Sequence, residues 1–196
     1  LFDYMANKNV ITWTALISAY SHYSEKRKTT FQLFCQMQEE GHLPNRVTYI
    51  AIASILAEVR EGKQMHVVVL ANGYVGDVVV RTAYADMYGK CGSLSDARCI
   101  FGNMSYHDPV TWTIMICSYA QNHENDEALH LFYQMICKGF HPDAITFICI
   151  MKACGRAQAI EKGKQVHENV VSTGLLEHNI VLGNALVDMY AKCGAF

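Results

Sequence analysis

Apolar side chains recur at helical spacing along the whole chain, in segments a few turns long that end at short polar turns. In the first two segments the apolar positions on one helical face are Trp13, Leu16, Ile17, Tyr20, Phe31, Phe34 and Met37. Gly41 and Pro44 end the second segment, as these residues often do just after a helix. The pattern therefore predicts paired amphipathic helices and an all-α fold.

The same helical pattern returns after about a hundred residues. The segment TAYADMYGKCG around Tyr88 returns as NALVDMYAKCG around Tyr190, 102 residues later. VITWTALISAY around Trp13 returns as PVTWTIMICSY around Trp112, 99 residues later. Periodicity of this kind is typical of a solenoid, in which each repeat contacts only its neighbours.

The repeated block holds three kinds of helix pair, which differ in length. The complete repeats are 10–45, 46–77, 78–108, 109–143 and 144–179, with partial repeats at 1–9 and 180–196. Their lengths of 36, 32, 31, 35 and 36 residues reproduce the two spacings. The second repeat lacks three residues at its turn, which predicts a tight turn or frayed helices, and Ser93 or Ser95 is expected to cap the second helix of the third. Stacked pairs predict an α-solenoid, a right-handed superhelix whose first helices line the concave face.

Composition favours a buried core without a membrane span. Of 196 residues, 51% are apolar and 17% charged, with three prolines, and no apolar run is long enough to cross a bilayer, so no membrane partner is expected. The eight cysteines form no C-x-x-C pair. They are expected to be reduced thiols packed in helices, in a reducing compartment, and no metal or cofactor is expected.

These repeats resemble those of the pentatricopeptide repeat (PPR) proteins of plant organelles. The resemblance rests on the cores TWTALISAY, GKQMH and NALVDMYAKCG, on repeat lengths near 35, 35 and 31, and covers the whole chain. It implies the PLS arrangement of pure (P), long (L) and short (S) motifs: P at 10–45 and 109–143, L at 46–77 and 144–179, S at 78–108 and 180–196, and the end of an S motif at 1–9. The short first L motif and one extra residue in EKRKTTF depart from the pattern. A mitochondrial or chloroplast location is implied, and a targeting segment cannot be judged from a chain that opens inside a repeat.

The resemblance implies binding of single-stranded RNA, with one base read per repeat. The fifth and last residues of a repeat would bond the base edge: Thr14 with Asn45, Thr82 with Asp108, Thr113 with Asp143, and Asn9 and Asn184 without partners. The second residues would sandwich the bases: Ile11, Val47, Val79, Val110, Ile145 and Val181. Because Asp only accepts hydrogen bonds it suits guanine, and because Asn also donates it suits adenine. Ile50 and Ile148 in the L motifs cannot read an edge, so the predicted target is A-N-G-G-N-Y.

Each of these residues also has a simpler interpretation. An Asn or Asp just before a helix is often only a cap. Trp13 and Trp112 are expected to be core residues rather than stacking platforms, and His66 and His167 to be packed or solvated rather than metal-bound. The basic run 26–28 is most simply a solvated surface, with phosphate contact as the alternative.

Three functions compete. The first is an RNA-recognition module, by resemblance one that selects C-to-U editing sites; the net charge of −2 argues against binding driven by phosphate alone. The second is a protein-binding scaffold of tetratricopeptide type, whose W-x2-L-G-x2-Y pattern is absent, although the L motifs are free to bind small accessory editing proteins. The third is an enzyme, but the H-x-E and P-C-x-x-C motifs of zinc deaminases are absent, so a deaminase domain would lie outside this chain. The truncated ends lack polar caps, which predicts self-association.

Overall fold

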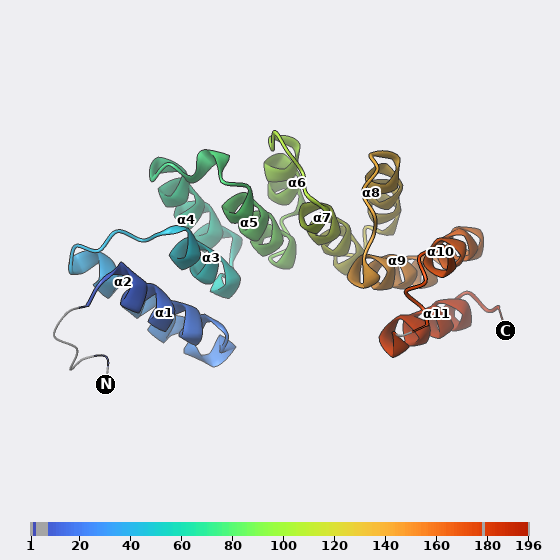
Figure 1. The fold of residues 1–196 in the computed structure, drawn as a ribbon, viewed down its shortest axis with the longest axis horizontal. Coiled ribbons are helices and arrows are strands. Elements are labelled where there is room, and N and C mark those ends of the chain that lie inside the picture. Colours follow the sequence, from blue (N-terminus) through green and yellow to red (C-terminus); the bar gives the residue numbers. More distant parts are fainter. Residues whose placement is uncertain (1, 3–7, 178, 196) are drawn as a thin grey trace. The chain divides into compact units, whose positions relative to one another are not determined.

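The computed structural model describes residue 2 and residues 8–177 and 179–195 (Figure 1). The predicted partial repeat at 1–9 therefore lies largely outside the described residues. The chain divides into two parts, residues 1–91 and 92–196, and each is described by itself. Within the described ranges every regular element is helical, which confirms the all-α prediction.

The first part consists of paired helices that begin and end close to the predicted turns. Its elements are α1 (Val10–Ser21), η2 (Ser24–Lys26), α2 (Arg27–Glu39), α3 (Arg46–Ile55), α4 (Val59–Ala71), η3 (Tyr74–Gly76) and α5 (Val78–Lys90). The first helices of successive pairs form a row, because α1 packs on α3 and α3 on α5 (Figure 1). The second helix α2 covers α1 and α3, and α4 packs on α5.

The second part repeats this arrangement. Its helices are α6 (Leu94–Gly102), α7 (Pro109–Gln121), α8 (Asn125–Cys137), α9 (Ala144–Ala157), α10 (Ile160–Ser172) and α11 (Ile180–Lys192). The first helices α7, α9 and α11 lie in a row, while α8 covers α7 and α9, and α10 covers α9 and α11. A solenoid core of this kind is continuous, because neither helix of a pair can bury its apolar stripe alone.

The cores contain the residues that the apolar pattern selects. Trp13 and Trp112 are 0% and 2% exposed, which confirms that both are core residues and rules out a stacking platform at either position. Phe34 of α2 contacts Tyr49 of α3 edge to face, and Phe132 of α8 contacts Phe147 of α9 in the same way. Aromatic contacts therefore join a second helix to the next first helix in both parts.

Two local expectations have definite outcomes. Leu56–Glu58 alone separate α3 from α4, so the predicted tight turn is confirmed, and α3 has 10 residues where the equivalent α9 has 14. Ser93 occupies the cap position of α6, but its hydroxyl makes no cap bond and instead donates to Asp96 Oδ2 at 2.5 Å. The expected serine cap of α6 is thus wrong in its chemistry, because an acidic side chain in the first turn competes for the hydroxyl.

The expectation that all cysteines are reduced thiols is wrong for one pair. Cys117 of α7 and Cys149 of α9 form a disulfide, because the packing of these two helices brings their Cα atoms to 5.3 Å. The other six cysteines, all within the described residues, are free thiols. Burial raises the pKa of the Cys154 thiol to about 11, so this cysteine is protonated at neutral pH.

Candidate nucleic-acid interface

Six apolar side chains that are predicted to sandwich bases are all exposed to solvent. Each is the second residue of a first helix, and their exposed fractions lie between 48% and 76%. They are Ile11, Val47, Val79, Val110, Ile145 and Val181. In the same helices the core positions Trp13 and Tyr49 are fully buried. A β-branched residue repeated at one exposed position of every first helix is therefore a feature that core packing does not explain.

The fifth-position threonines lie beside this row and are largely buried. Thr14 and Thr82 are 7% exposed and Thr113 is 9% exposed. The Oγ1 atoms of Thr14 and Thr48 are 2.8 Å apart, which joins α1 to α3. In the second part the Oγ1 atoms of Thr113 and Thr146 are 2.7 Å apart, which joins α7 to α9. The same hydroxyl pair thus occurs at both places where a P motif was expected to precede an L motif.

The last residue of a repeat caps the first helix of the next repeat, and Thr48 and Thr146 bind these capping side chains. Asn45 Oδ1 accepts from Thr48 N at 3.0 Å and from Thr48 Oγ1 at 3.1 Å. Asp143 Oδ1 accepts from Thr146 N at 2.8 Å and from Thr146 Oγ1 at 2.7 Å. The capping interpretation is confirmed for both, and one oxygen of each side chain is fully used by its cap.

The directions of these hydrogen bonds follow from the donor inventory. A carboxylate only accepts, so the single proton of the Thr146 hydroxyl is donated to Asp143 Oδ1. Thr146 Oγ1 can then only accept from Thr113, which leaves Thr113 Oγ1 with free lone pairs and no free proton. With the backbone N–H of Thr48 bound to Asn45 Oδ1, the same order holds from Thr14 through Thr48 to Asn45.

The outer edges of the last-position residues differ in chemistry. Among the described residues, no hydrogen bond involves Asn45 Nδ2 or Asp143 Oδ2. Asn45 therefore presents a donor and Asp143 an acceptor beside the exposed apolar row. Asp108 resembles Asp143, because its Oδ1 accepts from Thr111 N at 2.7 Å and from Thr111 Oγ1 at 2.6 Å. Its expected partner Thr82 belongs to the other part of the chain and donates to Val78 O at 2.7 Å.

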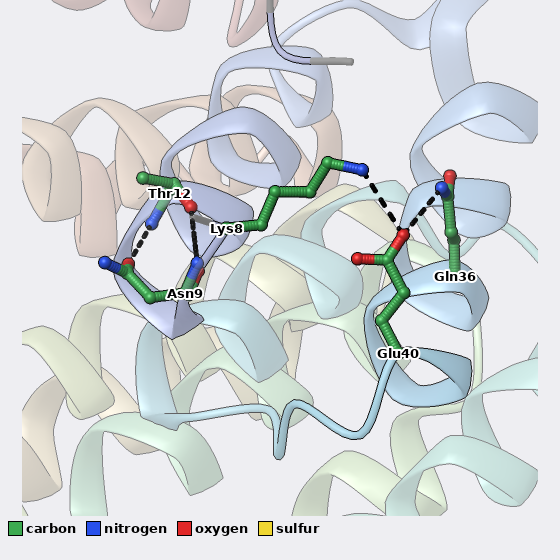
Figure 2. Close-up of polar contacts among 5 residues, drawn as sticks. All are labelled: Lys8, Asn9, Thr12, Gln36 and Glu40. Carbon is green, nitrogen blue, oxygen red and sulfur yellow. Dashed lines mark hydrogen bonds and ion pairs between the residues drawn. The ribbon is translucent and has the colours of Figure 1, made fainter. Parts of the chain in front are cut away.

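The two candidates without partners lie at the outer helices. Asn9 caps α1: its Oδ1 accepts from Thr12 N at 3.0 Å, and its own N–H donates to Thr12 Oγ1 at 2.9 Å (Figure 2). Next to it, Lys8 Nζ donates to Glu40 Oε1 at 3.3 Å, and that oxygen also accepts from Gln36 (Figure 2). Asn184 is an exposed residue of α11. The Lys8 charge beside Asn9 is thus already engaged by an acidic side chain.

The expected L motifs lack the hydroxyl arrangement. Ile50 and Ile148 occupy their fifth positions and are partly buried. Their last residues still cap the next helix, since Asp77 Oδ1 accepts from the N–H groups of Val79 and Val80, and Asn179 Oδ1 accepts from that of Leu182. The third residues of these next helices, α5 and α11, are Val80 and Leu182, so no side-chain hydroxyl binds either cap.

The threonines at the third helical position were missed by sequence reasoning. Threonine stands there in α1, α3, α7 and α9, whose caps are candidate base-edge residues: Thr12, Thr48, Thr111 and Thr146. It is replaced by an apolar residue in α5 and α11, which follow the expected L motifs. This alternation is visible in the sequence once the repeats are aligned.

Other polar candidates have structural roles. His167 Nδ1 lies 3.0 Å from the Tyr190 hydroxyl, and His66 packs against Tyr84, which confirms that both histidines are packed. No group of three metal-ligating side chains exists among the described residues. Arg27 of the basic run pairs with Glu61 of α4. In the described part of the chain, no helix has the length and apolar character needed to span a membrane.

Comparison with known proteins gives consistent similarities. The model of the PPR repeat family matches residues 8–58 and 107–156. The chain is 37% identical over 196 residues to the Arabidopsis thaliana pentatricopeptide repeat-containing protein At4g18520, chloroplastic. The alignment covers 98% of this chain and 31% of that protein. It is 35% identical over 197 residues to At3g09040, mitochondrial, from the same organism, with 99% and 19% covered. The chain thus spans a third or less of the length of these two relatives.

Solved structures share the fold at low sequence identity. A crystal structure of the pentatricopeptide repeat protein PPR10 in complex with an 18-nt psaJ RNA element matches with a TM-score of 0.81 and 16% identity, over 97% of this chain and 29% of that one. A crystal structure of PPR10 from maize matches with a TM-score of 0.69 and 21% identity, over 95% and 28%. These likenesses confirm the stacked helical-repeat fold expected from the sequence.

Proposed function

Because the chain belongs to the PPR repeat family, we propose that it binds single-stranded RNA along the N-terminal ends of its first helices, one base per repeat. The observation that carries this proposal is the exposed β-branched side chain at the second position of every first helix, three in each part of the chain. Flat bases fit between such side chains, and burial of both surfaces would stabilise the complex. The crystal structure of PPR10 with an RNA element supports the same class of ligand.

The free edges beside the row match particular bases. Thr14 presents an acceptor and Asn45 a donor, and the Watson–Crick edge of adenine carries the complementary N6–H donor and N1 acceptor. Thr113 and Asp143 both present acceptors, and guanine alone has adjacent donors, N1–H and the 2-amino group. Cytosine carries the same two groups as adenine on a smaller ring, so the first nucleotide needs a direct competition between them.

The proposed division into repeats assigns a nucleotide to each. With P motifs at 10–45 and 109–143, L motifs at 46–77 and 144–179, and S motifs at 78–108 and 180–196, the target is A-N-G-G-N-Y. A role in selecting C-to-U editing sites is proposed only from the resemblance to PLS arrays, and the chloroplastic and mitochondrial names of the two relatives favour an organellar location. The chain supplies recognition; H-x-E and P-C-x-x-C are absent from its sequence.

A second candidate, a protein-binding scaffold, is favoured by one surface. On α4 and the following turn, Val67 is 67% exposed, Leu70 37% and Val75 55%. These side chains belong to an expected L motif, whose Ile50 presents no polar edge to a base. A small accessory protein bound there would leave the row of first-helix N-termini open.

The proposed function is tested by titrating the chain with fluorescent ACGGCU and ACAACU RNA and measuring anisotropy. We expect tighter binding of ACGGCU, and a shift toward ACAACU for the double variant Asp108→Asn, Asp143→Asn, in which each cap keeps its oxygen but presents a donor. Asp77→Asn is the matched control, because it makes the same change at a cap that follows an L motif. Equal affinity of the wild-type chain for both strands would reject base reading, and absence of binding would favour the scaffold.

A further inference from the structure

We propose that Thr48 and Thr146 are positioning residues that set which hydrogen-bonding groups the RNA base meets. This inference rests on the proposed function and adds a residue to each base-reading pair. Both threonines are 0% exposed, so neither hydroxyl touches a base. Their effect is transmitted through Thr14 and Asn45 in the first part and through Thr113 and Asp143 in the second.

The hydroxyl of Thr146 controls both members of its pair at once. It accepts a hydrogen bond from the Thr113 hydroxyl and donates one to Asp143 Oδ1. Thr113 is thereby fixed as an acceptor, and the carboxylate is turned so that Oδ2 faces outward. Thr48 does the same for Thr14 and Asn45, where the backbone N–H of residue 48 already binds Oδ1 and leaves Nδ2 as the free end of the amide. A buried relay of this kind presents a defined pattern before the ligand arrives, which is how preorganised sites gain specificity.

Helix capping alone does not account for these threonines. Asp77 and Asn179 cap α5 and α11 through backbone N–H groups, with Val80 and Leu182 at the third position. Those two caps follow the expected L motifs, whose fifth residue is isoleucine and needs no fixed proton. Threonine is present at all four helices whose cap is a candidate base-edge residue and at neither of the two others. Its occurrence therefore follows the candidate base-edge caps, although in α1 and α3 the threonine also closes a capping box with Asn9 and Asn45.

Removal of the hydroxyl frees the proton of the fifth-position residue. In a Thr146→Val chain, Thr113 could turn its proton toward the base and donate to adenine N1 as readily as it accepts from guanine. Asp143 Oδ1 would keep the backbone N–H of residue 146, so α9 would still be capped. We expect the preference for guanine over adenine at the fourth nucleotide to fall about three- to tenfold, the effect of one hydrogen bond.

The experiment compares Thr146→Val, Thr146→Ser and Thr30→Val in the full chain, with ACGGCU and ACGACU RNA. The serine variant restores the hydroxyl without the methyl group. Thr30 is an equally buried threonine of α2 whose hydroxyl donates only to Lys26 O, so its valine variant controls for loss of a buried hydroxyl. The readouts are the ratio of the two dissociation constants and the thermal melting temperature.

The inference is supported if Thr146→Val alone loses discrimination at the fourth nucleotide and Thr146→Ser regains it. It is overturned if Thr146→Val discriminates as the wild-type chain does, or if it weakens both RNAs equally while the melting temperature falls, as a purely structural residue would. If the wild-type chain itself shows no preference, the proposed function fails and this inference fails with it. The ratio of the two dissociation constants of the wild-type chain therefore distinguishes failure of the proposed function from failure of this inference alone.

Discussion

Cys117 of α7 and Cys149 of α9 are joined by a disulfide, and it spans the same two helices as the hydrogen bond between Thr113 and Thr146. Cys117 follows Thr113 by four residues and Cys149 follows Thr146 by three, so the covalent and polar links lie about one helical turn apart. The spacing of these two first helices is thus fixed close to Thr113 and Asp143, the proposed base-reading pair.

The first prediction concerns this bond. In denaturant without reductant, a thiol reagent should label six cysteines per chain, and after reduction all eight. A cross-link between residues separated by 32 positions is expected to contribute about 3.7 kcal/mol by restricting the unfolded chain. Cys117→Ser should therefore lower the melting temperature, whereas Cys137→Ser, at an exposed free thiol, should not. Labelling of eight cysteines before reduction would show that the bond is absent.

The second prediction separates the exposed apolar row from the core. Ile145 is 61% exposed and Ile150, five residues later on α9, is 0% exposed. Ile145→Ala should change the free energy of unfolding by less than about 0.5 kcal/mol but weaken RNA binding about fivefold, the effect of losing about 1 kcal/mol of apolar burial against a base. Ile150→Ala should cost about 2–5 kcal/mol of stability.

Chemical denaturation and RNA titration of the two variants provide the measurements. The matched pair changes the same residue type in the same helix, so a difference in helix propensity cannot produce the contrast. If Ile145→Ala binds RNA as tightly as the wild-type chain, bases do not pack at this position, and the exposed row needs another explanation.

Much of the fold follows from local sequence features. The 3.6-residue apolar period is sufficient for the helices, and Asn or Asp before each first helix is sufficient for its start, as Asn45 and Asp143 demonstrate. The burial of Trp13 and Trp112 follows from their place on the apolar face. Such features depend only on neighbours along the chain, which is why they are predictable from one sequence.

The rest depends on which helices pack together. The hydroxyl contact of Thr14 joins it to a residue 34 positions away, and Cys117 finds Cys149 only because α7 packs on α9. At the third position of a helix, Thr48 alone indicates no more than a favourable helix start. Its role becomes visible when the polar atoms around it are counted and the proton of each hydroxyl is assigned.

The third prediction tests a close helix approach. A Cβ on Gly155 of α9 would lie 3.3 Å from the backbone Cα of Met189 in α11, whereas one on Gly183 of α11 would meet nothing within 4 Å. Gly155→Val should therefore destabilise the chain by about 1–3 kcal/mol through overpacking. Gly183→Val is the matched control, and it should be neutral or slightly stabilising because valine has the higher helix propensity. Equal destabilisation of both variants in urea unfolding would contradict the packing of α9 on α11.

The fourth prediction concerns the salt dependence of RNA binding. The chain has a net charge of −2, and several of its cations are engaged: Lys8 with Glu40, Lys90 with Asp86, and Lys192 with Asp188. Few phosphates can then be neutralised, so a plot of log affinity against log salt should have a slope of about −1 to −2, not the roughly −4 expected for six phosphate contacts with a single strand.

The same experiment with Ile145→Ala shows which forces hold the RNA. This variant changes no charge, so its affinity should fall by a constant factor at every salt concentration and its slope should equal that of the wild-type chain. A slope near −4 for the wild-type chain would mean that phosphate contacts dominate. The exposed apolar side chains would then contribute little to the affinity. Recognition of base edges would be supported only if the preference for guanine over adenine persisted at high salt. A shallow slope with a parallel line for the variant is the result expected if packing of bases between β-branched side chains supplies most of the affinity.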